Sequence, residues 1–374
     1  MTQKTKATSL AVSAILKAMN MSITEKLLSL TSVWEKLQKE KSPIALYGTG
    51  NGADTVLDVF EDLGVKASAV CASDGFVRKR TFRDFEVISI SKTLEVFENP
   101  LFCLSFASSI PEVMESIIGL SKKHRLLVPV VPVFGKDIID RDFIIKNKDK
   151  IESAYNLLAD EKSKEIFENI LTFEFTGELE FLLKTESSRQ EALCELLRLT
   201  DKEHYADLGA YRGDTIDELS CLCSGFEKAY AFEPDKKTFL KLKENTKDFE
   251  NLSLFPYALW KENTALNFSG GGGRQSALNS EGYEVEAVAL DSVLGDKKLT
   301  YIKADVEGAE KEAIEGMSRI LREQKPKLCI SAYHKSADIF ELILQIHSIN
   351  PQYKIHLRHH PYIPAWDTNI YCTV

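Results

Sequence analysis

Three short segments in the C-terminal half of the chain contain residue types that could bind a ligand and move a proton. They are residues 207–214 (DLGAYRGD), 232–235 (FEPD) and 303–310 (KADVEGAE). Each follows a short apolar run typical of a strand and precedes a helical pattern. Together they predict a glycine turn and several carboxylates at the carboxyl ends of successive parallel strands, where open α/β sheets bind ligands.

The glycine turn is the first part of a predicted cofactor site. Gly209 and Gly213 let the backbone turn sharply and approach a ligand closely. No lysine follows these glycines to grip a phosphate, as it would in a P-loop. We expect Asp207 to bind an ammonium group of the cofactor, and Ala210 and Asp214 to line the same pocket. Asp214 could equally cap the helix that follows it.

An acid at the end of the next strand is the second part of this site. Glu233 follows Gly209 at about the spacing at which an acid meets ribose hydroxyls in dinucleotide-type folds. A surface acid at a strand end is the alternative interpretation. Ala258, which follows the third predicted strand, could supply backbone contacts to adenine. The combination predicts a nucleoside-type cofactor.

Asp305 and His334 are the candidates for catalysis. Asp305 ends a predicted buried strand, where it could accept the proton of a substrate hydroxyl or fix one end of the cofactor. Glu310 opens the next helix and is better explained by the helix dipole. His334 follows a later strand at the same sheet edge, and the roles of base and bystander both stay open. A divalent metal shared by Asp305 and Glu307 is an alternative that two carboxylates do not favour, so no metal site is assigned.

Seven strands must position these residues. The last two are joined by a proline-containing loop, which predicts an antiparallel hairpin. A mostly parallel sheet closed by one antiparallel hairpin is the pattern of class I methyltransferases. The strands are expected at residues 205–208, 229–232, 253–257, 301–304, 328–332, 353–357 and 369–373.

A glycine-rich stretch at 270–273 predicts a loop that could close over the acceptor.

The N-terminal half predicts a second, smaller α/β domain. Strands alternate with helices over residues 43–140, which is typical of a Rossmann-like domain. Its glycine turn, GTGNG at 48–52, lacks the full dinucleotide fingerprint, so a structural role and a substrate-handling role both stay open. Residues 1–42 form a predicted N-terminal helical segment, in which one helix starts at a capping box formed by Ser22 and Glu25. Residues 141–200 are a predicted helical connector, and 201–374 the larger domain.

Length and composition exclude several classes of protein. A chain of 374 residues predicts two domains, and 44% hydrophobic with 28% charged residues is typical of a soluble globular protein. A net charge of −9 argues against nucleic-acid binding. The longest apolar run, residues 126–134, contains two prolines and is too short to span a membrane. Seven cysteines without a C-x-x-C pair predict a reduced, cytoplasmic chain.

The sequence resembles the FkbM family of S-adenosylmethionine-dependent methyltransferases. The resemblance rests on D-x-G-A-x-x-G-D, F-E-P-D, K-x-D-V-E-G-A-E and the late pair Tyr333–His334, and it covers roughly residues 200–374. It implies S-adenosylmethionine as cofactor and O-methylation of a hydroxyl on a small-molecule, sugar or glycan-related acceptor. Residues 43–140 are similar to Rossmann units attached to some bacterial members, which would suit a nucleotide-linked acceptor.

Two other functions remain as alternatives. One is an NAD-dependent oxidoreductase acting through the N-terminal Rossmann-like domain, and the missing third motif glycine counts against it. The other is a non-catalytic nucleotide-binding protein, which would not need carboxylates at three strand ends. The acceptor's identity, the methylated position and the oligomeric state stay open at this point.

Overall fold

The computed structural model describes residues 21–77, 81–269, 277–278 and 283–374. The chain forms two compact units. Unit 1 comprises Met1–Val131, Asp137–Asn156 and Glu168–Lys184, and unit 2 comprises Pro132–Lys136, Leu157–Phe167 and Thr185–Val374. The boundaries predicted at residues 42, 140 and 200 stay a prediction, because these units are grouped by contact and alternate along the chain. The loop predicted at 270–273 lies outside the described residues.

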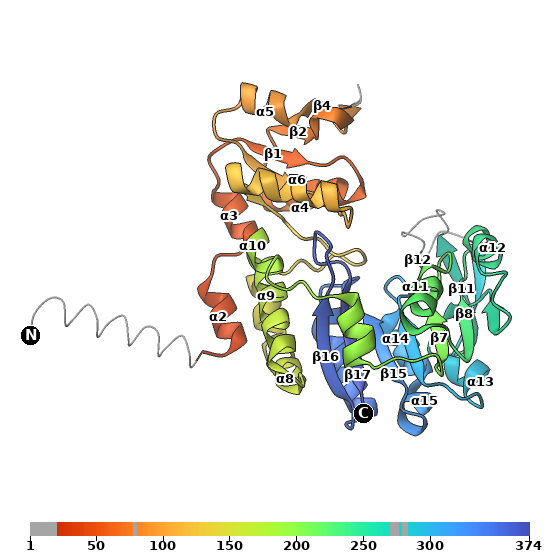
Figure 1. Ribbon diagram of the computed structural model, residues 1–374. Coiled ribbons are helices and arrows are strands. Elements are labelled where there is room, and N and C mark those ends of the chain that lie inside the picture. Colours follow the sequence, from red (N-terminus) through yellow and green to blue (C-terminus); the bar gives the residue numbers. More distant parts are fainter. Residues whose placement is uncertain (1–20, 78–80, 270–276, 279–282) are drawn as a thin grey trace, which may run out of the picture. The chain divides into compact units, whose positions relative to one another are not determined.

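Unit 2 is built on a seven-stranded sheet (Figure 1) with the strand order β16-β17-β15-β14-β7-β8-β9. All neighbouring pairs are parallel except those of β17, which runs antiparallel to both β15 and β16. This confirms the predicted class I methyltransferase fold with its terminal hairpin. The strands are β7 (His204–Leu208), β8 (Lys228–Phe232), β9 (Leu252–Phe255), β14 (Tyr301–Ala304), β15 (Lys327–Ser331), β16 (Lys354–His359) and β17 (Thr368–Thr373).

The strands form because their side chains are buried on both faces of the sheet. In β7 and β14 the paired rings of Tyr205 and Tyr301 stack with their centroids 4.9 Å apart, and both side chains are almost fully buried. Such two-sided burial explains why these strands appear in the sequence as short continuous apolar runs. The helices that connect them are α11 (Asp214–Cys223), α12 (Lys236–Asn245), α13 (Leu290–Leu294), α14 (Glu310–Gly316), α15 (Ser318–Glu323) and α16 (Asp338–Ile349), with the π-helix η2 (Glu191–Leu196) preceding the sheet.

A second, four-stranded sheet in unit 2 has the order β10-β13-β11-β12. The predicted third strand therefore ends earlier than expected, and Ala258 opens β10 instead of following directly from β9. The short lengths of these strands explain why periodicity did not separate them. They are β10 (Ala258–Leu259), β11 (Thr264–Ser269), β12 (Ala277–Leu278) and β13 (Tyr283–Val288).

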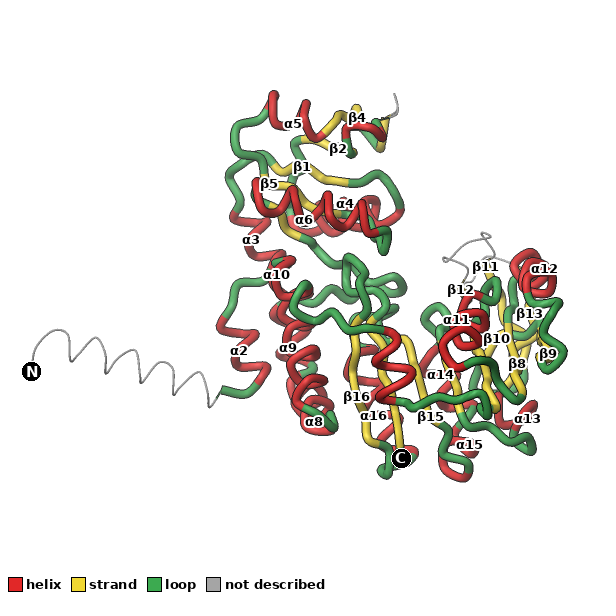
Figure 2. The backbone as a smooth tube through the Cα atoms, in the orientation of Figure 1, coloured by secondary structure: helices red, strands yellow, loops and turns green. Residues whose placement is uncertain are grey.

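Unit 1 contains the expected smaller α/β domain (Figure 2, strands in yellow), with the sheet order β3-β4-β2-β1-β5-β6. All pairs are parallel except β3 with β4. The strands are β1 (Ile44–Tyr47), β2 (Ala69–Ala72), β3 (Thr81–Phe82), β4 (Phe85–Ser89), β5 (Leu101–Leu104) and β6 (Leu126–Leu127). The helices of this domain are η1 (Asp74–Phe76), α4 (Asn51–Leu63), α5 (Ile90–Val96) and α6 (Pro111–Lys123).

The single helix expected after Ser22 is two helices, α2 (Ile23–Ser29) and α3 (Val33–Lys39). Ser32 and Glu35 form a second capping box, which starts a new helix where the apolar spacing alone predicted a continuous one. The predicted helical connector contains α7 (Arg141–Lys146), α8 (Lys148–Leu157), α9 (Glu161–Thr176) and α10 (Leu179–Leu182). Among the described residues, no helix has the length and apolarity that a membrane crossing requires.

The glycine turn of unit 1 is explained by packing. A Cβ atom on Gly48 would lie 2.7 Å from the Ser105 hydroxyl, and one on Gly52 would lie 2.7 Å from the Ser105 carbonyl oxygen. Ser105 follows β5, the strand beside β1. The two glycines therefore let the turn after β1 pack closely against the end of β5.

Candidate active site

The glycine turn after β7 is held by backbone contacts. Gly209 has a φ of +86°, and the N–H groups of Gly209 and Ala210 donate to the Phe232 carbonyl at 3.1 and 2.9 Å. A Cβ atom on Gly209 would lie only 1.9 Å from the Asp305 carbonyl oxygen. The close approach that requires a glycine is therefore to the backbone after β14, whereas the sequence suggested approach to a ligand.

The helix after this turn begins at Gly213, which is the N-cap residue of α11 and has a φ of +92°. A Cβ atom on Gly213 would lie 2.6 Å from Thr246 Cγ2, so this position also leaves no room for a side chain. Asp214 is the first residue of α11 and is exposed. The alternative that Asp214 caps this helix is therefore wrong, because the N-cap residue is Gly213, which has no side chain to form a cap. The dipole of α11 favours an acid at position 214.

Asp207 is a fully buried carboxylate with an unused oxygen. Its Oδ2 accepts a hydrogen bond from the Thr215 hydroxyl, and its Oδ1 lies 3.6 Å from Lys303 Nζ without a hydrogen-bond partner. Burial raises the pKa of Asp207, an effect that the Lys303 ammonium opposes. A buried oxygen without a hydrogen bond is unfavourable, and an ammonium donor would satisfy it. Asp207 therefore fits the amino group of a cofactor.

Lys303 links this carboxylate to Asp305. It pairs with Asp207 in the register of β14 and β7, and its Nζ lies 3.9 Å from Asp305 Oδ2 and 3.4 Å from the Gly209 carbonyl oxygen. Burial lowers the pKa of Lys303, but Asp207 and Asp305 raise it well above its usual value, so the amine stays charged. The sequence interpretation gave Lys303 no role, although the alternation of K-x-D already put Lys303 and Asp305 on one face.

Glu233 follows β8 and is 7% exposed. Its Oε1 accepts the N–H of Asp235 at 2.8 Å, and burial raises its pKa to about 7. Asp235 has a structural role that the sequence did not reveal: it caps α12 through Thr238 and accepts the Tyr283 hydroxyl at 2.8 Å. A buried carboxylate at the end of the second strand suits a ribose diol.

Ala258 is buried in the small sheet and not in the seven-stranded one. It pairs with Ala287 of β13 and packs in a cluster with Val285. Glu233 is connected to this region because its N–H donates to the Phe255 carbonyl at the end of β9. The contact of Ala258 with adenine stays a prediction.

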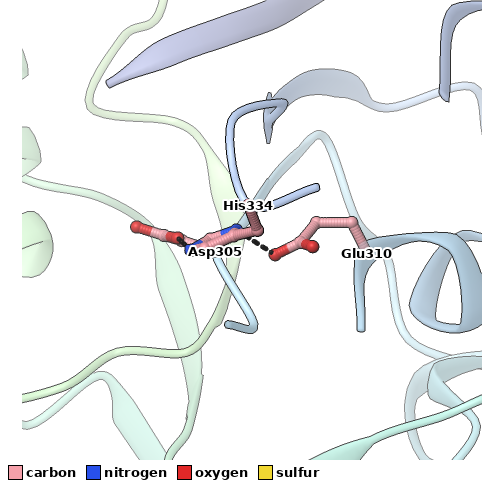
Figure 3. A group of neighbouring side chains, drawn as sticks. All are labelled: Asp305, Glu310 and His334. Atoms are coloured by element: carbon pink, nitrogen blue, oxygen red, sulfur yellow. Dashed lines mark ion pairs between the residues drawn. The ribbon is translucent and has the colours of Figure 1, made fainter. Parts of the chain in front are cut away.

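Asp305, Glu310 and His334 form a cluster at the carboxyl edge of the sheet (Figure 3). His334 Nδ1 lies 3.0 Å from Glu310 Oε1, and His334 Nε2 lies 3.6 Å from Asp305 Oδ1. Glu307 Oε2 is 3.3 Å from the same Nε2, and the Tyr333 hydroxyl donates to Asp305 Oδ1 at 3.1 Å. The two predicted catalytic residues are therefore neighbours in space.

The loop after β14 presents these acids in a strained conformation. Glu307 has a φ of +53°, which is uncommon for a residue with a side chain, and Gly308 has a φ of +89°. Glu310 Oε1 accepts the N–H of Val306 at 2.9 Å and so closes the loop. The structural role expected for Glu310 stays a prediction, and the same oxygen also faces His334.

The charges in the cluster are strongly coupled. Burial lowers the pKa of His334, yet Glu310, Glu307 and Asp305 together raise it well above its usual value. Burial also raises the pKa of Asp305, but Lys303 and His334 bring it below its usual value. Asp305 is thus an ionised carboxylate, and its side chain is 30% exposed while that of His334 is 1% exposed.

A segment far away in the sequence completes the cluster. Phe134 donates its N–H to the His334 carbonyl at 3.0 Å, and the two rings lie 5.9 Å apart. A Cβ atom on Gly308 would lie 2.7 Å from the Phe134 ring, so this glycine makes room for the aromatic side chain. Nothing in the sequence around Phe134 indicates this contact, because it depends on tertiary packing.

The strand order, the glycine turn after β7 and the acids at the ends of β8 and β14 define a class I methyltransferase fold. Residues 207–358 match the model of the methyltransferase FkbM domain. Unit 2 therefore contains an FkbM methyltransferase domain, and its methyl donor is S-adenosylmethionine. The family and cofactor expected from the sequence are confirmed.

One solved structure supports this fold, and two others are similar over about half of the chain. Methyltransferase FkbM from Methylobacillus flagellatus KT is similar to the chain with a TM-score of 0.69 and 21% identity, over 98% of this chain and 99% of that one. A precorrin-6y C5,15-methyltransferase from Geobacter metallireducens GS-15 has a TM-score of 0.33 and 14% identity, over 49% of this chain and 86% of that one. Aeropyrum pernix fibrillarin with natively bound S-adenosyl-L-methionine has a TM-score of 0.32 and 12% identity, over 49% of this chain and 73% of that one. Only the first value is high enough to support a shared fold. Curated protein sequences give no match.

Replacing Gly209 by alanine tests the close approach to Asp305. We expect Gly209→Ala to lose about 2–4 kcal/mol of unfolding free energy, because the new methyl group meets a backbone oxygen that has little freedom to move. Gly225→Ala is the matched control: Gly225 also has a positive φ, but nothing lies within 4 Å of its added Cβ. The control should lose about 1–2 kcal/mol from backbone strain alone. Equal losses in urea denaturation would contradict the packing argument.

The raised pKa of Glu233 predicts a pH-dependent stability. The folded chain binds this proton more tightly than the unfolded chain does, so stability is lost as the pH rises from about 4.5 through 7. This difference in pKa between the folded and unfolded chains corresponds to roughly 3 kcal/mol of unfolding free energy. Glu233→Gln should therefore be more stable than the ligand-free wild type at pH 8, and this gain should nearly vanish at pH 4, below the unfolded pKa. Urea denaturation at both pH values measures it. A gain independent of pH, or one shared by the exposed Glu250→Gln, refutes the assignment.

Proposed function

We propose that unit 2 transfers a methyl group from S-adenosylmethionine to a hydroxyl oxygen of a sugar or glycan-related acceptor. The observation that carries this proposal is the ionised Asp305 beside His334, at the sheet edge that also presents Asp207 and Glu233. Bound S-adenosylmethionine supplies an activated methyl group whose bond to sulfur breaks as the acceptor oxygen attacks. The protein must then align the acceptor and accommodate its proton.

Six residues, five in and around the turn after β7 and one after β8, would hold the cofactor. Asp207 would accept the amino group through its unused Oδ1, and Glu233 would accept the ribose hydroxyls. Gly209, Ala210 and Gly213 would form the backbone wall between them, with Asp214 at its exposed end. The N–H groups of Gly209 and Ala210 already donate to the Phe232 carbonyl, so they are not free to bind a phosphate. This suits a cofactor that has no phosphate group.

Asp305 and His334 would act on the acceptor hydroxyl. Asp305 is the more accessible of the two, and Lys303 keeps it ionised, so it can accept the proton. His334 is buried, and the carboxylates around it favour its protonated form. We therefore assign proton removal to Asp305 and the positioning of that carboxylate to His334.

An aromatic pair near this edge supports a sugar as acceptor. Tyr362 and Trp366 lie in the loop between β16 and β17, with ring centroids 5.8 Å apart and both side chains half-buried. This loop ends beside the site, because Ala332, next to Tyr333, donates its N–H to the Thr368 carbonyl at 2.9 Å. Aromatic rings offer the flat apolar contact that the C–H face of a sugar ring prefers.

The alternative of an NAD-dependent oxidoreductase finds no support in unit 1, because the packing of Gly48 and Gly52 against Ser105 already explains its glycine turn. A nucleotide-linked acceptor is also part of the proposal, and unit 1 would then bind its nucleotide. The cytoplasmic location predicted from the cysteines belongs to the proposal as well.

The acceptor class can be tested directly. The full chain with methyl-labelled S-adenosylmethionine should label simple glycosides or nucleotide sugars, and mass spectrometry of the product should place the methyl group on oxygen. S-adenosylhomocysteine should bind once per chain in calorimetry. Labelling only at nitrogen or carbon acceptors, with the cofactor bound, would contradict the proposed function.

The roles of Asp305 and His334 predict a separation of turnover from binding. Asp305→Asn should lower kcat by roughly 10²–10⁴-fold, because the carboxylate acts on the reacting hydroxyl. His334→Gln should lower it by at least tenfold through misplacement of Asp305. Both should bind S-adenosylhomocysteine nearly as tightly as the wild type. Full turnover with weakened binding in Asp305→Asn would instead make Asp305 a cofactor residue. Glu315→Gln, an exposed acid on α14, is the control.

A further inference from the structure

We propose that Asp305, Glu310 and His334 hold a divalent cation, which binds the acceptor hydroxyl. One possible ligand atom from each residue lies within 4.8 Å of the other two, and Figure 3 shows His334 between the two carboxylates. A cation with bonds of about 2.1–2.4 Å places its ligand atoms roughly 3.0–4.8 Å apart, from adjacent to opposite positions. The cluster therefore has the dimensions of a coordination site.

Two buried atoms in the cluster have no hydrogen bond. His334 Nδ1 lies 3.0 Å from Glu310 Oε1 without the geometry of a hydrogen bond, and Glu310 Oε2 has no partner in the described part of the chain. Both side chains are only 1% exposed. Buried polar atoms without partners are rare in folded proteins, and a coordinated cation would satisfy a ring nitrogen and a carboxylate together.

The cluster carries more acid than its neighbours balance. Asp305, Glu307 and Glu310 surround a single imidazole, and the buried Asp338 adds a fourth carboxylate nearby. The Lys303 ammonium lies 3.9 Å from Asp305, but it also faces Asp207. A divalent charge would offset this excess where a single proton on the imidazole would offset only part of it.

The site has one closed side and one open side. Glu310 and His334 are almost fully buried, whereas the side chains of Asp305 and Glu307 are 30% and 28% exposed. A cation held by buried ligands with an open position is the arrangement that binds a substrate oxygen. Two carboxylates with one imidazole suit Mn²⁺, which accepts oxygen ligands and imidazole nitrogen.

This inference rests on the proposed function for the identity of the bound oxygen, and it replaces the roles given there to Asp305 and His334. The cation would make the hydroxyl proton more acidic, and the proton would leave to solvent. Asp305 would then be a ligand of the cation instead of the proton acceptor. A cation and a proton on the facing nitrogen of His334 exclude each other, because metal ligands must be deprotonated.

The test is the binding of Mn²⁺ to the full chain after a chelator has removed any metal. Binding is measured from the loss of the electron paramagnetic resonance signal of free Mn²⁺. We expect one Mn²⁺ per chain. Asp305→Asn and Glu310→Gln should each weaken binding by tenfold or more, and Glu315→Gln on the same helix should not change it. Circular dichroism and S-adenosylhomocysteine binding show that each variant is folded, and Asp305→Asn is the safer variant because Asp305 is partly exposed.

Absence of Mn²⁺ binding, or equal binding in the wild type and both cluster variants, would overturn the cation site. Full methyl transfer in the presence of the chelator would overturn it too, while leaving the proposed function intact. If Mn²⁺ binds through these residues but no hydroxyl acceptor is methylated, the proposed function fails and the cation site stands.

Discussion

The pairing of the largely buried Lys303 amine with Asp207 and Asp305 is the interaction on which both halves of the site depend. An unpaired charge in a protein interior is strongly unfavourable, and this amine is offset by Asp207 on one side and Asp305 on the other. The register of β7 and β14 puts Lys303 directly opposite Asp207. The acid that would hold the cofactor and the acid that would face the acceptor are thus coupled through one cation. Loss of the amine would leave the buried Asp207 without a facing cation and Asp305 with His334 alone.

The distance between these halves is set by backbone atoms. The Asp305 N–H donates to the Leu208 carbonyl at 2.9 Å, and the Asp305 carbonyl lies so close to Gly209 that no Cβ fits between them. Methyl transfer requires the acceptor oxygen to approach in line with the breaking bond, and small misplacements are expensive in rate. Backbone contacts in a buried sheet hold this spacing more rigidly than flexible side chains would.

The cofactor half could be predicted because its information is local. Gly209, Gly213 and Glu233 follow apolar strands within one short stretch, and the seven strands are visible as apolar runs because both sheet faces are buried. The second capping box at Ser32 and the strands of the small sheet were missed, since short elements carry little periodic signal. The sequence predicts only a helix-dipole role for Glu310, because no sequence pattern shows that His334 folds against it.

The acceptor half is assembled from long-range contacts, and this difference has a physical consequence. Asp305 and Glu310, His334, and Phe134 come from three separate segments, and a buried polar cluster is favourable only when all its members are in place. A change in packing at Phe134 or Gly308 would therefore disturb the charges around His334 without touching the turn after β7. Under the proposed function, such packing changes would alter the acceptor half, while the local geometry of β7, its turn and α11 would preserve the binding of S-adenosylmethionine.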